Sequence, residues 1–162
     1  MSLYITLIAV LCSAHGAAAV AVRFDESSVS GSPFPTNRYT VVDTDNLTGK
    51  RVALPVPDCA SRKSDCEDMA ILNKLDGFST DPRISLPFTG PIDIDTATSR
   101  TIFLVNLGDV VSGHGKGQRI GINQRLWDAN TSTMFFKPDN ILAESSEYTL
   151  IVSDGLLDLT GK

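Results

Sequence analysis

The fold is decided by two stretches with the pattern of β-strands, TIFLVNL at residues 101–107 and EYTLIVS at residues 147–153. The first contains the unbroken apolar run IFLV, which is typical of a strand buried on both faces or lying at the centre of a sheet. In the second, Tyr148, Leu150 and Val152 recur at every other position, a period that places their side chains on one face of a strand. Both stretches therefore predict central strands that contribute to a hydrophobic core.

Weaker strand patterns surround these two. The segment RISLPF at residues 83–88 alternates apolar and polar side chains, and its proline predicts an edge strand because proline has no N–H for a neighbouring strand. Residues 120–127 and 133–137 flank the turn-forming residues 128–131 and predict a hairpin, and residues 108–121 form a glycine-rich loop. Short strands with one helix favour an antiparallel β-sandwich over an α/β sheet. The predicted class is all-β.

The segment before these strands predicts a small extension with its own elements. Residues 38–42 and 51–56 are short apolar-leaning runs joined by a loop of turn-forming residues, so we expect an antiparallel pair. Ser64 and Glu67 fit a capping box, in which two side chains satisfy free N–H groups at a helix start. Apolar residues then recur every three positions, which predicts one short helix ending by Gly77.

The N-terminus has the composition of an export signal. Residues 3–19 are mostly Leu, Ile, Val and Ala, carry no Asp, Glu, Lys or Arg and end in three alanines. This predicts a signal peptide over residues 1–19. The usual positive region is missing, so a buried N-terminal strand or helix is the alternative. Cys12 lacks the small preceding residue that lipid attachment requires, which argues against a lipoprotein.

Composition and charge limit the number of domains and the kinds of partner that we expect. Residues 20–37 are rich in Ser, Gly and Pro and predict an extended lead-in, followed by one domain over residues 38–162. The net charge is -5, and 14 basic and 19 acidic residues are scattered without a basic stripe, so nucleic acid is not an expected partner. Beyond the N-terminus no apolar stretch is long enough to span a bilayer, so we expect no transmembrane segment after signal removal. The expected location is secreted, periplasmic or at the cell surface.

Two cysteines remain after signal cleavage, Cys59 and Cys66. A close, even pair in an exported chain predicts one disulfide that closes a short loop. Zinc would need further ligands, and the one histidine that remains, His114, lies far away in sequence. A disulfide is therefore preferred, with a metal site or two free thiols as alternatives, and no cofactor is expected.

No catalytic constellation is present in the sequence. The chain has no Gly-x-Ser-x-Gly pentapeptide, which a hydrolase needs to present a nucleophilic serine, and His114 is predicted to be a solvated loop residue. The run GHGKG at residues 113–117 lacks the spacing of a phosphate-binding loop. The Asp and Asn residues at 43–46 and 93–95 could bind calcium, but without a complete calcium loop turn formation is preferred. We therefore predict no catalytic, cofactor-binding or metal-binding residue and no enzyme.

Several segments together resemble two known kinds of bacterial sequence. The chain resembles the bacterial Ig-like (SbsA-type) domain family over roughly half its length, in RISLPFTGPID (83–93), TIFLV (101–105), LWD (126–128), TMFFKP (133–138) and YTLIVSDG (148–155). The upstream part is similar to the N-terminal region of secreted bacterial lipases of the virulence-factor type. Its residues are PFPTN (33–37), RVALP (51–55), the two cysteines and LNKLDGF (72–78). In those lipases an Ig-like domain precedes an α/β-hydrolase domain.

The sequence contains one independent sign of an Ig-like sandwich. Leu142 lies six residues before Tyr148, which matches a tyrosine corner, where the phenol hydroxyl bonds an upstream backbone group. A Tyr148 whose ring merely packs is the alternative. Trp127 lies beyond both cysteines, so the Cys, Trp, Cys order of antibody domains is absent. Trp127, Leu142 and Tyr148 are therefore predicted to be structural residues.

The resemblance implies a non-catalytic, exported Ig-like accessory or binding module. A hydrolase domain of the same protein or a cell-surface polymer is the expected partner. Two alternatives remain open: the N-terminal fragment of a secreted lipase or esterase, and a free-standing adhesin or surface-layer module. An in-frame continuation beyond Lys162 carrying a Gly-x-Ser-x-Gly turn would favour the lipase.

Overall fold

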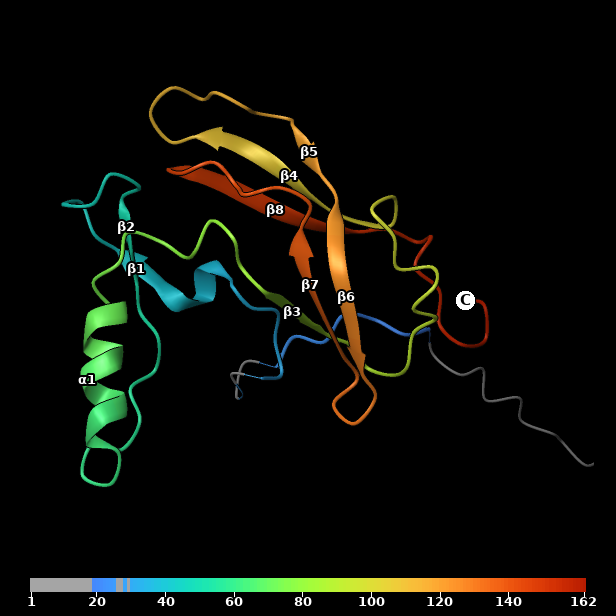
Figure 1. The fold of residues 1–162 in the computed structure, drawn as a ribbon, viewed down its shortest axis with the longest axis horizontal. Helices are drawn as coiled ribbons and strands as arrows, with labels where there is room; N and C mark the ends of the chain where they lie inside the picture. The colour runs from blue at the N-terminus through green and yellow to red at the C-terminus, as the bar shows by residue number, and fades with distance from the viewer. Residues whose placement is uncertain (1–18, 26–27, 29) are drawn as a thin grey trace, which may run out of the picture.

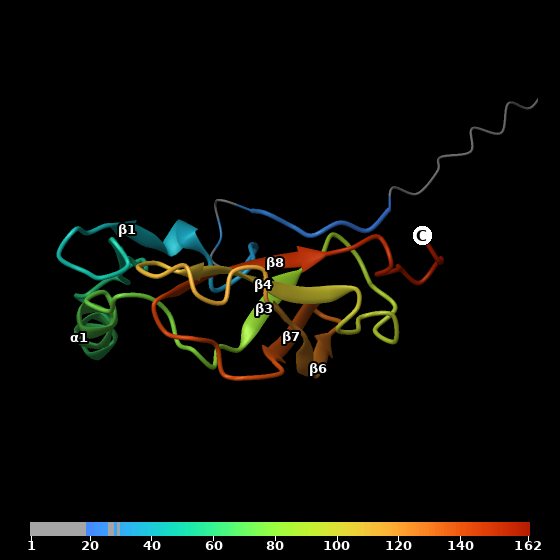
Figure 2. The same cartoon turned by 90° about the horizontal axis from the view of Figure 1, so that it is seen from above.

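The computed structural model describes residues 19–25, 28 and 30–162 of the chain. The predicted signal peptide, except for Ala19, lies outside the described residues. Cys12, the position considered for lipid attachment, therefore also lies outside them. The described chain is elongated, with the helix at one end and the C-terminus at the other (Figures 1 and 2).

The described elements are mainly strands. In chain order they are the 3-10 helix η1 (Asn37–Tyr39), β1 (Thr40–Val42), β2 (Lys50–Val52), α1 (Lys63–Leu72), β3 (Ile84–Pro87), β4 (Ile102–Asp109), β5 (Arg119–Ile120), β6 (Ile122–Asp128), β7 (Thr133–Pro138) and β8 (Ser146–Val152).

Two three-stranded antiparallel sheets form the sandwich. One has the order β3-β7-β6 and the other β5-β4-β8, and the strands β1 and β2 form a separate pair. Side chains from both sheets share one hydrophobic core, with Leu86 and Phe136 from the first sheet and Ile102 and Leu104 from the second. The predicted all-β class, an antiparallel sandwich with one short helix in an N-terminal extension, is confirmed.

The central strand β4 buries one face. Ile102, Leu104 and Asn106 are buried, whereas Phe103 is half-buried and its ring lies 3.5 Å from the Arg119 guanidinium carbon. Of the two sequence interpretations, the sheet centre is correct, because β4 lies between β5 and β8. Burial on both faces is wrong. The continuous apolar run therefore has one face in the core and a half-buried outer face, on which the Arg119 side chain lies over the Phe103 ring. The prediction of a second central strand at residues 147–153 is wrong, because β8 lies at the edge of the sheet, although its apolar face packs against the core.

The predicted hairpin and edge strand are both present. Strands β6 and β7 pair in antiparallel fashion, with Trp127 opposite Met134. On β3, the carbonyl oxygen of Pro87 accepts a bond from the Arg23 N–H at 2.8 Å, so this residue's backbone faces away from β7. The missing N–H of Pro87 therefore interrupts no bond to β7, which explains why proline is tolerated at this edge.

The lead-in lies along the outer edge of β3. Besides the Arg23 bond, Phe34 and Ser85 exchange both backbone hydrogen bonds, at 3.0 and 2.8 Å, and the Thr89 N–H donates to the Ala21 carbonyl oxygen. The extended chain thus continues the β3 sheet outward.

The N-terminal extension, residues 38–82, contains the predicted antiparallel pair, in which Thr40 lies opposite Val52. The helix α1 begins earlier than its capping pattern predicted. Arg62 is the N-cap and has no side-chain cap bond, and Ser64 lies inside the helix. The capping box is therefore wrong. A turn at residues 58–62, in which the Arg62 N–H donates to the Asp58 carbonyl oxygen at 2.9 Å, leads into the helix instead.

Candidate functional site

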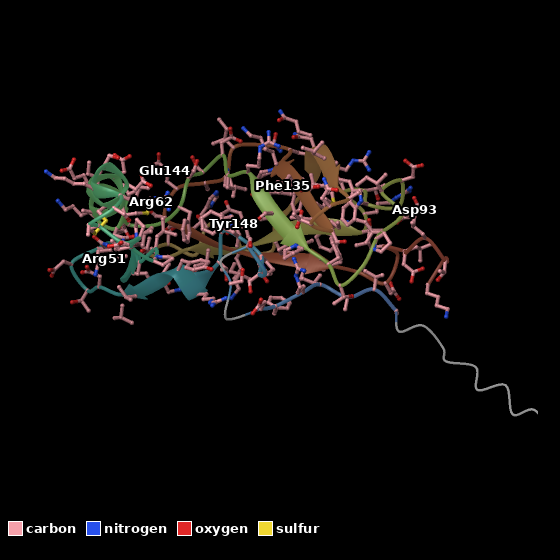
Figure 3. The ribbon with its side chains drawn as sticks, turned by 90° about the horizontal axis from the view of Figure 1, so that it is seen from below. Arg51, Arg62, Asp93, Phe135, Glu144 and Tyr148 are labelled. Atoms are coloured by element: carbon pink, nitrogen blue, oxygen red, sulfur yellow. A yellow bond between two sulfur atoms is a disulfide. The ribbon has the colours of Figure 1, made fainter. Side chains whose placement is uncertain are left out.

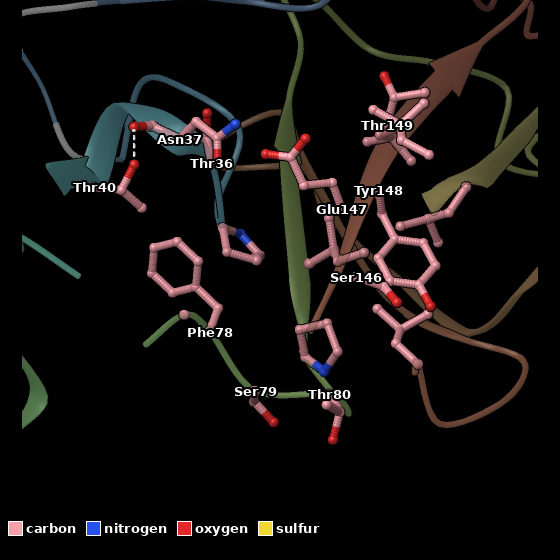
Figure 4. Close-up of a pocket in the computed structure, with 18 of the residues that line it drawn as sticks. Thr36, Asn37, Thr40, Phe78, Ser79, Thr80, Ser146, Glu147, Tyr148 and Thr149 are labelled. Carbon is pink, nitrogen blue, oxygen red and sulfur yellow. Dashed lines mark hydrogen bonds between the residues drawn. The ribbon is translucent and has the colours of Figure 1, made fainter. Parts of the chain in front are cut away.

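A groove of about 640 Å³ lies between β8 and the N-terminal part of the chain (Figure 4). Its first wall consists of residues 142–150 and Val152, and its second wall consists of lead-in and extension residues. The size is in the range of small-ligand and peptide sites. The second wall and rim include Phe24, Pro33, Pro35, Thr36, Asn37, Thr40, Thr48, Lys50, Asp76, Phe78, Ser79 and Thr80.

Tyr148 organises the first wall. Its hydroxyl accepts a hydrogen bond from the Ala143 N–H at 2.8 Å, and the Asn106 side-chain amide donates to the same oxygen at 3.3 Å. Leu142, beside Ala143, packs against the hydrophobic core. This is the geometry that a tyrosine corner predicts, a phenol bound to a backbone group a few residues upstream. Tyr148 thus holds the turn before β8 against the central strand β4.

The second wall is stiffened by aromatic rings. The ring centroid of Phe34 lies 5.4 Å from that of Phe78 in an edge-to-face arrangement and 5.8 Å from that of Tyr39. Of these three rings only that of Phe78 lines the groove, together with Pro33 and Pro35, which flank Phe34 in sequence and have little freedom of φ. The part of the wall formed by Pro33, Pro35 and Phe78 therefore consists of side chains with few accessible rotamers.

Polar contacts join the two walls. Lys50 on β2 forms an ion pair with Glu147 on β8, and the Leu142 N–H donates to the Thr80 carbonyl oxygen at 2.8 Å. Within the extension, the Thr48 hydroxyl donates to the Asp76 carboxylate. An exposed ion pair contributes little stability, so the Lys50–Glu147 contact orients the two walls more than it stabilises them.

The predicted disulfide is present between Cys59 and Cys66, with Cα atoms 5.7 Å apart (Figure 3). It joins the turn before α1 to the first turns of the helix. At the other end of α1, the Asn73 side chain exchanges two hydrogen bonds with the backbone of Leu54, at 2.7 and 3.0 Å. The Arg51 guanidinium also donates to the Asn73 carbonyl oxygen, at 2.6 Å. Both ends of α1 are therefore anchored, although the helix buries none of its residues.

Exposed apolar side chains concentrate on the extension. Seven of the fifteen large hydrophobic residues found exposed in the described chain lie between residues 41 and 75, which is less than a quarter of the sequence. They are Val41, Val42, Leu47, Val56, Ile71, Leu72 and Leu75. Ile71 and Leu72 are the last two residues of α1, and Leu75 lies in the turn that follows it.

The aspartates that the sequence offered as calcium ligands do not form one site. Asp43 accepts from the Asp45 N–H and pairs with Arg51, and Asp93 accepts from the Asp95 N–H. These are turn interactions, and Asp93 lies at the opposite end of the molecule from α1 (Figure 3). Across the described residues there is no group of three His, Cys, Asp or Glu side chains suited to a metal ion.

His114 lies exposed in the loop between β4 and β5, where its carbonyl oxygen accepts from the Asp109 N–H at 3.0 Å. The backbone N–H and the hydroxyl of Ser112 bind the Asp109 carboxylate and lower its pKa. The loop is thus organised by an aspartate turn. Trp127 is half-buried on β6, and its ring centroid lies 6.1 Å from that of Phe88.

The sequence did not indicate the groove or Asp158. Asp158 is buried, and one of its carboxylate oxygens accepts bonds from the Thr160 N–H and hydroxyl, each at 2.7 Å, and from the Lys162 N–H. The Thr160 hydroxyl is the main cause that lowers the pKa of Asp158. Spacing of two to four residues is the signal for such a turn, whereas the groove joins segments distant in sequence.

No helix within the described residues has the length and apolar character to cross a membrane.

The chain was compared with known proteins, solved structures and family models. No individually curated protein matches the chain. Two solved structures match, that of the S-layer protein rSbsC(31-844) and that of the surface layer protein SbsC, domains 1-6. Each is 17% identical with a TM-score of 0.39, and the match covers 66% of this chain but 15% of the S-layer chain. The model of the bacterial Ig-like domain matches residues 65–162, more than half of the sequence. The chain belongs to the bacterial Ig-like domain family.

Proposed function

We propose that the chain is an exported, non-catalytic accessory module that docks onto a neighbouring protein domain through its N-terminal extension. The observation that carries this proposal is the concentration of exposed apolar side chains between residues 41 and 75. Exposed apolar side chains are ordinary when scattered singly, whereas their concentration in one short segment favours an interaction site. A surface anchored at both ends of α1 and left uncovered is suited to a partner.

Two further observations support export and a non-catalytic role. The Cys59–Cys66 disulfide is stable in an oxidising compartment, which agrees with the N-terminal signal pattern. The sequence has no Gly-x-Ser-x-Gly turn, and His114 contacts its loop through backbone atoms. The lipase resemblance supplies a candidate neighbour, an α/β-hydrolase domain, while a cell-surface polymer would be bound by the same extension in an adhesin or surface-layer module.

Site-specific photo-crosslinking tests the proposal. A photo-crosslinkable amino acid is placed at Ile71, which is 64% exposed, in the chain as the bacterium exports it. The control is the same amino acid at Leu126 on β6, which is 59% exposed. We expect one defined protein adduct from position 71, identified by mass spectrometry, and none from position 126. The same adducts from both positions, or none from position 71, would contradict docking through the extension.

A further inference from the structure

The outer edge of β8 offers backbone groups for another strand. On the far side of the same sheet, the Asn106 N–H donates to the Gln118 carbonyl oxygen and the Asn106 carbonyl oxygen accepts from the Gly117 N–H, each at 2.8 Å. The backbone groups of Asn106 therefore face β5. Because consecutive residues of a strand direct their backbone groups to opposite sides, those of Phe103 and Val105 face β8.

The register of the β4–β8 pair then identifies the free groups. Thr149 and Ile151 lie opposite the two β4 residues that face them, so their backbone groups point to β4. Tyr148, Leu150 and Val152 alternate with these residues. Their N–H and C=O groups point away from β4, toward the outer edge of the sheet.

The groove runs along this edge. It is lined by every residue from Ser145 to Leu150 and by Val152. Pro33 and Pro35 on the opposite wall have no N–H, and the lead-in directs its backbone bonds to β3. Among the described residues, none forms a backbone bond to this edge of β8. An unpaired edge of this length is a template for an added strand.

The charges of the groove indicate what fits it. Three acidic side chains, Asp76, Glu144 and Glu147, line it together with one basic side chain, Lys50. The lining also includes apolar core residues such as Leu86 and Leu104. An occupant that is complementary to both features carries basic side chains toward the rim and apolar side chains toward the core.

We propose that the groove binds an extended, basic segment of a partner protein, which pairs with β8 as an additional antiparallel strand. The backbone of the segment supplies the bonds to Tyr148, Leu150 and Val152, and alternate apolar side chains enter the groove. The extension contributes one wall of the groove, but none of its seven exposed apolar residues lines it, so either proposal stands without the other.

A synthetic octapeptide of alternating Val and Lys is the probe, since its length is close to that of β8. Opposite Leu150, an inward Val of an antiparallel strand exchanges both backbone bonds with it. Methylation of the Val nitrogens therefore removes the bonds that Val donates and places methyl groups against β8, whereas methylation of the Lys nitrogens, which face away, leaves both sets of bonds intact. We expect the parent and Lys-methylated peptides to bind with similar Kd and the Val-methylated peptide to bind at least tenfold more weakly. Equal binding of all three peptides would overturn strand addition.

Hydrogen exchange locates the binding site. We expect the parent peptide to slow exchange of the Tyr148, Leu150 and Val152 amides at least tenfold. Protection confined to other residues, or no binding of the peptide, would overturn the proposal. If sedimentation shows a dimer whose β8 amides are protected without peptide, a second copy occupies the edge, and the partner assignment is wrong.

Charge recognition in the groove is tested with matched variants. Glu144→Gln should weaken binding of the Val-Lys peptide about threefold, and a Val-Glu octapeptide should bind at least tenfold more weakly than the Val-Lys peptide. Glu67→Gln, on the exposed face of α1, is the control and should leave the Kd unchanged. An equal effect of the two substitutions would overturn recognition of basic side chains in the groove.

Discussion

The sandwich with its loops contains eleven of the thirteen buried hydrophobic residues of the described chain, whereas the extension contributes two, Tyr39 and Val52. The extension is held instead by the disulfide and by the hydrogen bonds of Arg51 and Asn73. The burial of apolar side chains thus stabilises the sandwich. The disulfide and individual hydrogen bonds stabilise the extension. A region that does not use its apolar side chains for its own core keeps them available for a partner.

The core of the sandwich should show the largest effect. Phe136 on β7 is fully buried, so Phe136→Ala removes a ring from the shared core and leaves a cavity. We expect a loss of about 3 to 5 kcal/mol in the free energy of unfolding. Urea denaturation measures this loss, with Leu126→Ala at an exposed position of β6 as the control. A loss below that of the control would show that the two sheets do not share this core.

Removal of the disulfide should act on the extension alone. Changing Cys59 and Cys66 together to Ser releases a loop with a sequence separation of 7, and the chain-entropy model predicts a cost of about 2 to 3 kcal/mol. Hydrogen exchange should become faster at the Val52 and Asn73 amides, both bonded within the extension. The Phe88 amide, bonded to Ser132 in the sandwich, is the control. Equal acceleration at Phe88 would mean that the two regions unfold as one unit.

Tyr148→Phe tests the turn that borders the groove. The ring stays in place, but the Ala143 N–H and the Asn106 side-chain amide lose their shared acceptor. We expect a loss of about 1 to 2 kcal/mol. Thermal unfolding of the variant checks this value, and Tyr39→Phe, in the extension, serves as a comparison. No change in Tm for Tyr148→Phe would mean that its ring, and not its hydroxyl, fixes the turn.

Local sequence patterns predicted the sandwich better than the extension. The alternation of apolar residues predicted the β6–β7 hairpin and the central place of β4. The spacing between Leu142 and Tyr148 predicted the backbone bond of the Tyr148 hydroxyl. Residues close in sequence determine all three features. The capping box at Ser64 failed because the turn at Asp58 starts the helix two residues earlier than the pattern requires. Ser64 and Glu67 have the spacing of a capping box, but they cannot cap a helix whose start is already determined by the preceding turn at residues 58–62.

The groove could not be predicted from such patterns. Its ion pair joins Lys50 to Glu147, residues 97 positions apart, and its rim contact joins Thr48 to Asp76. Neither contact has a fixed spacing, because each depends on where the extension lies against the sandwich. The exposure of Ile71 could not be predicted either. An apolar residue in a short helix ordinarily indicates a buried face.

Ile71→Gln is expected to have the smallest effect on stability and therefore separates packing from binding. The side chain of Ile71 is exposed and contributes to no core cluster, so the change removes little buried apolar area. Surface substitutions of this kind alter the free energy of unfolding by no more than about 0.5 kcal/mol. Urea denaturation of Ile71→Gln beside Ile102→Gln, at a buried position of β4, makes the contrast. A loss at Ile71 near that at Ile102 would mean that the apolar side chains of the extension are part of its own fold, and that a partner is not needed to explain them.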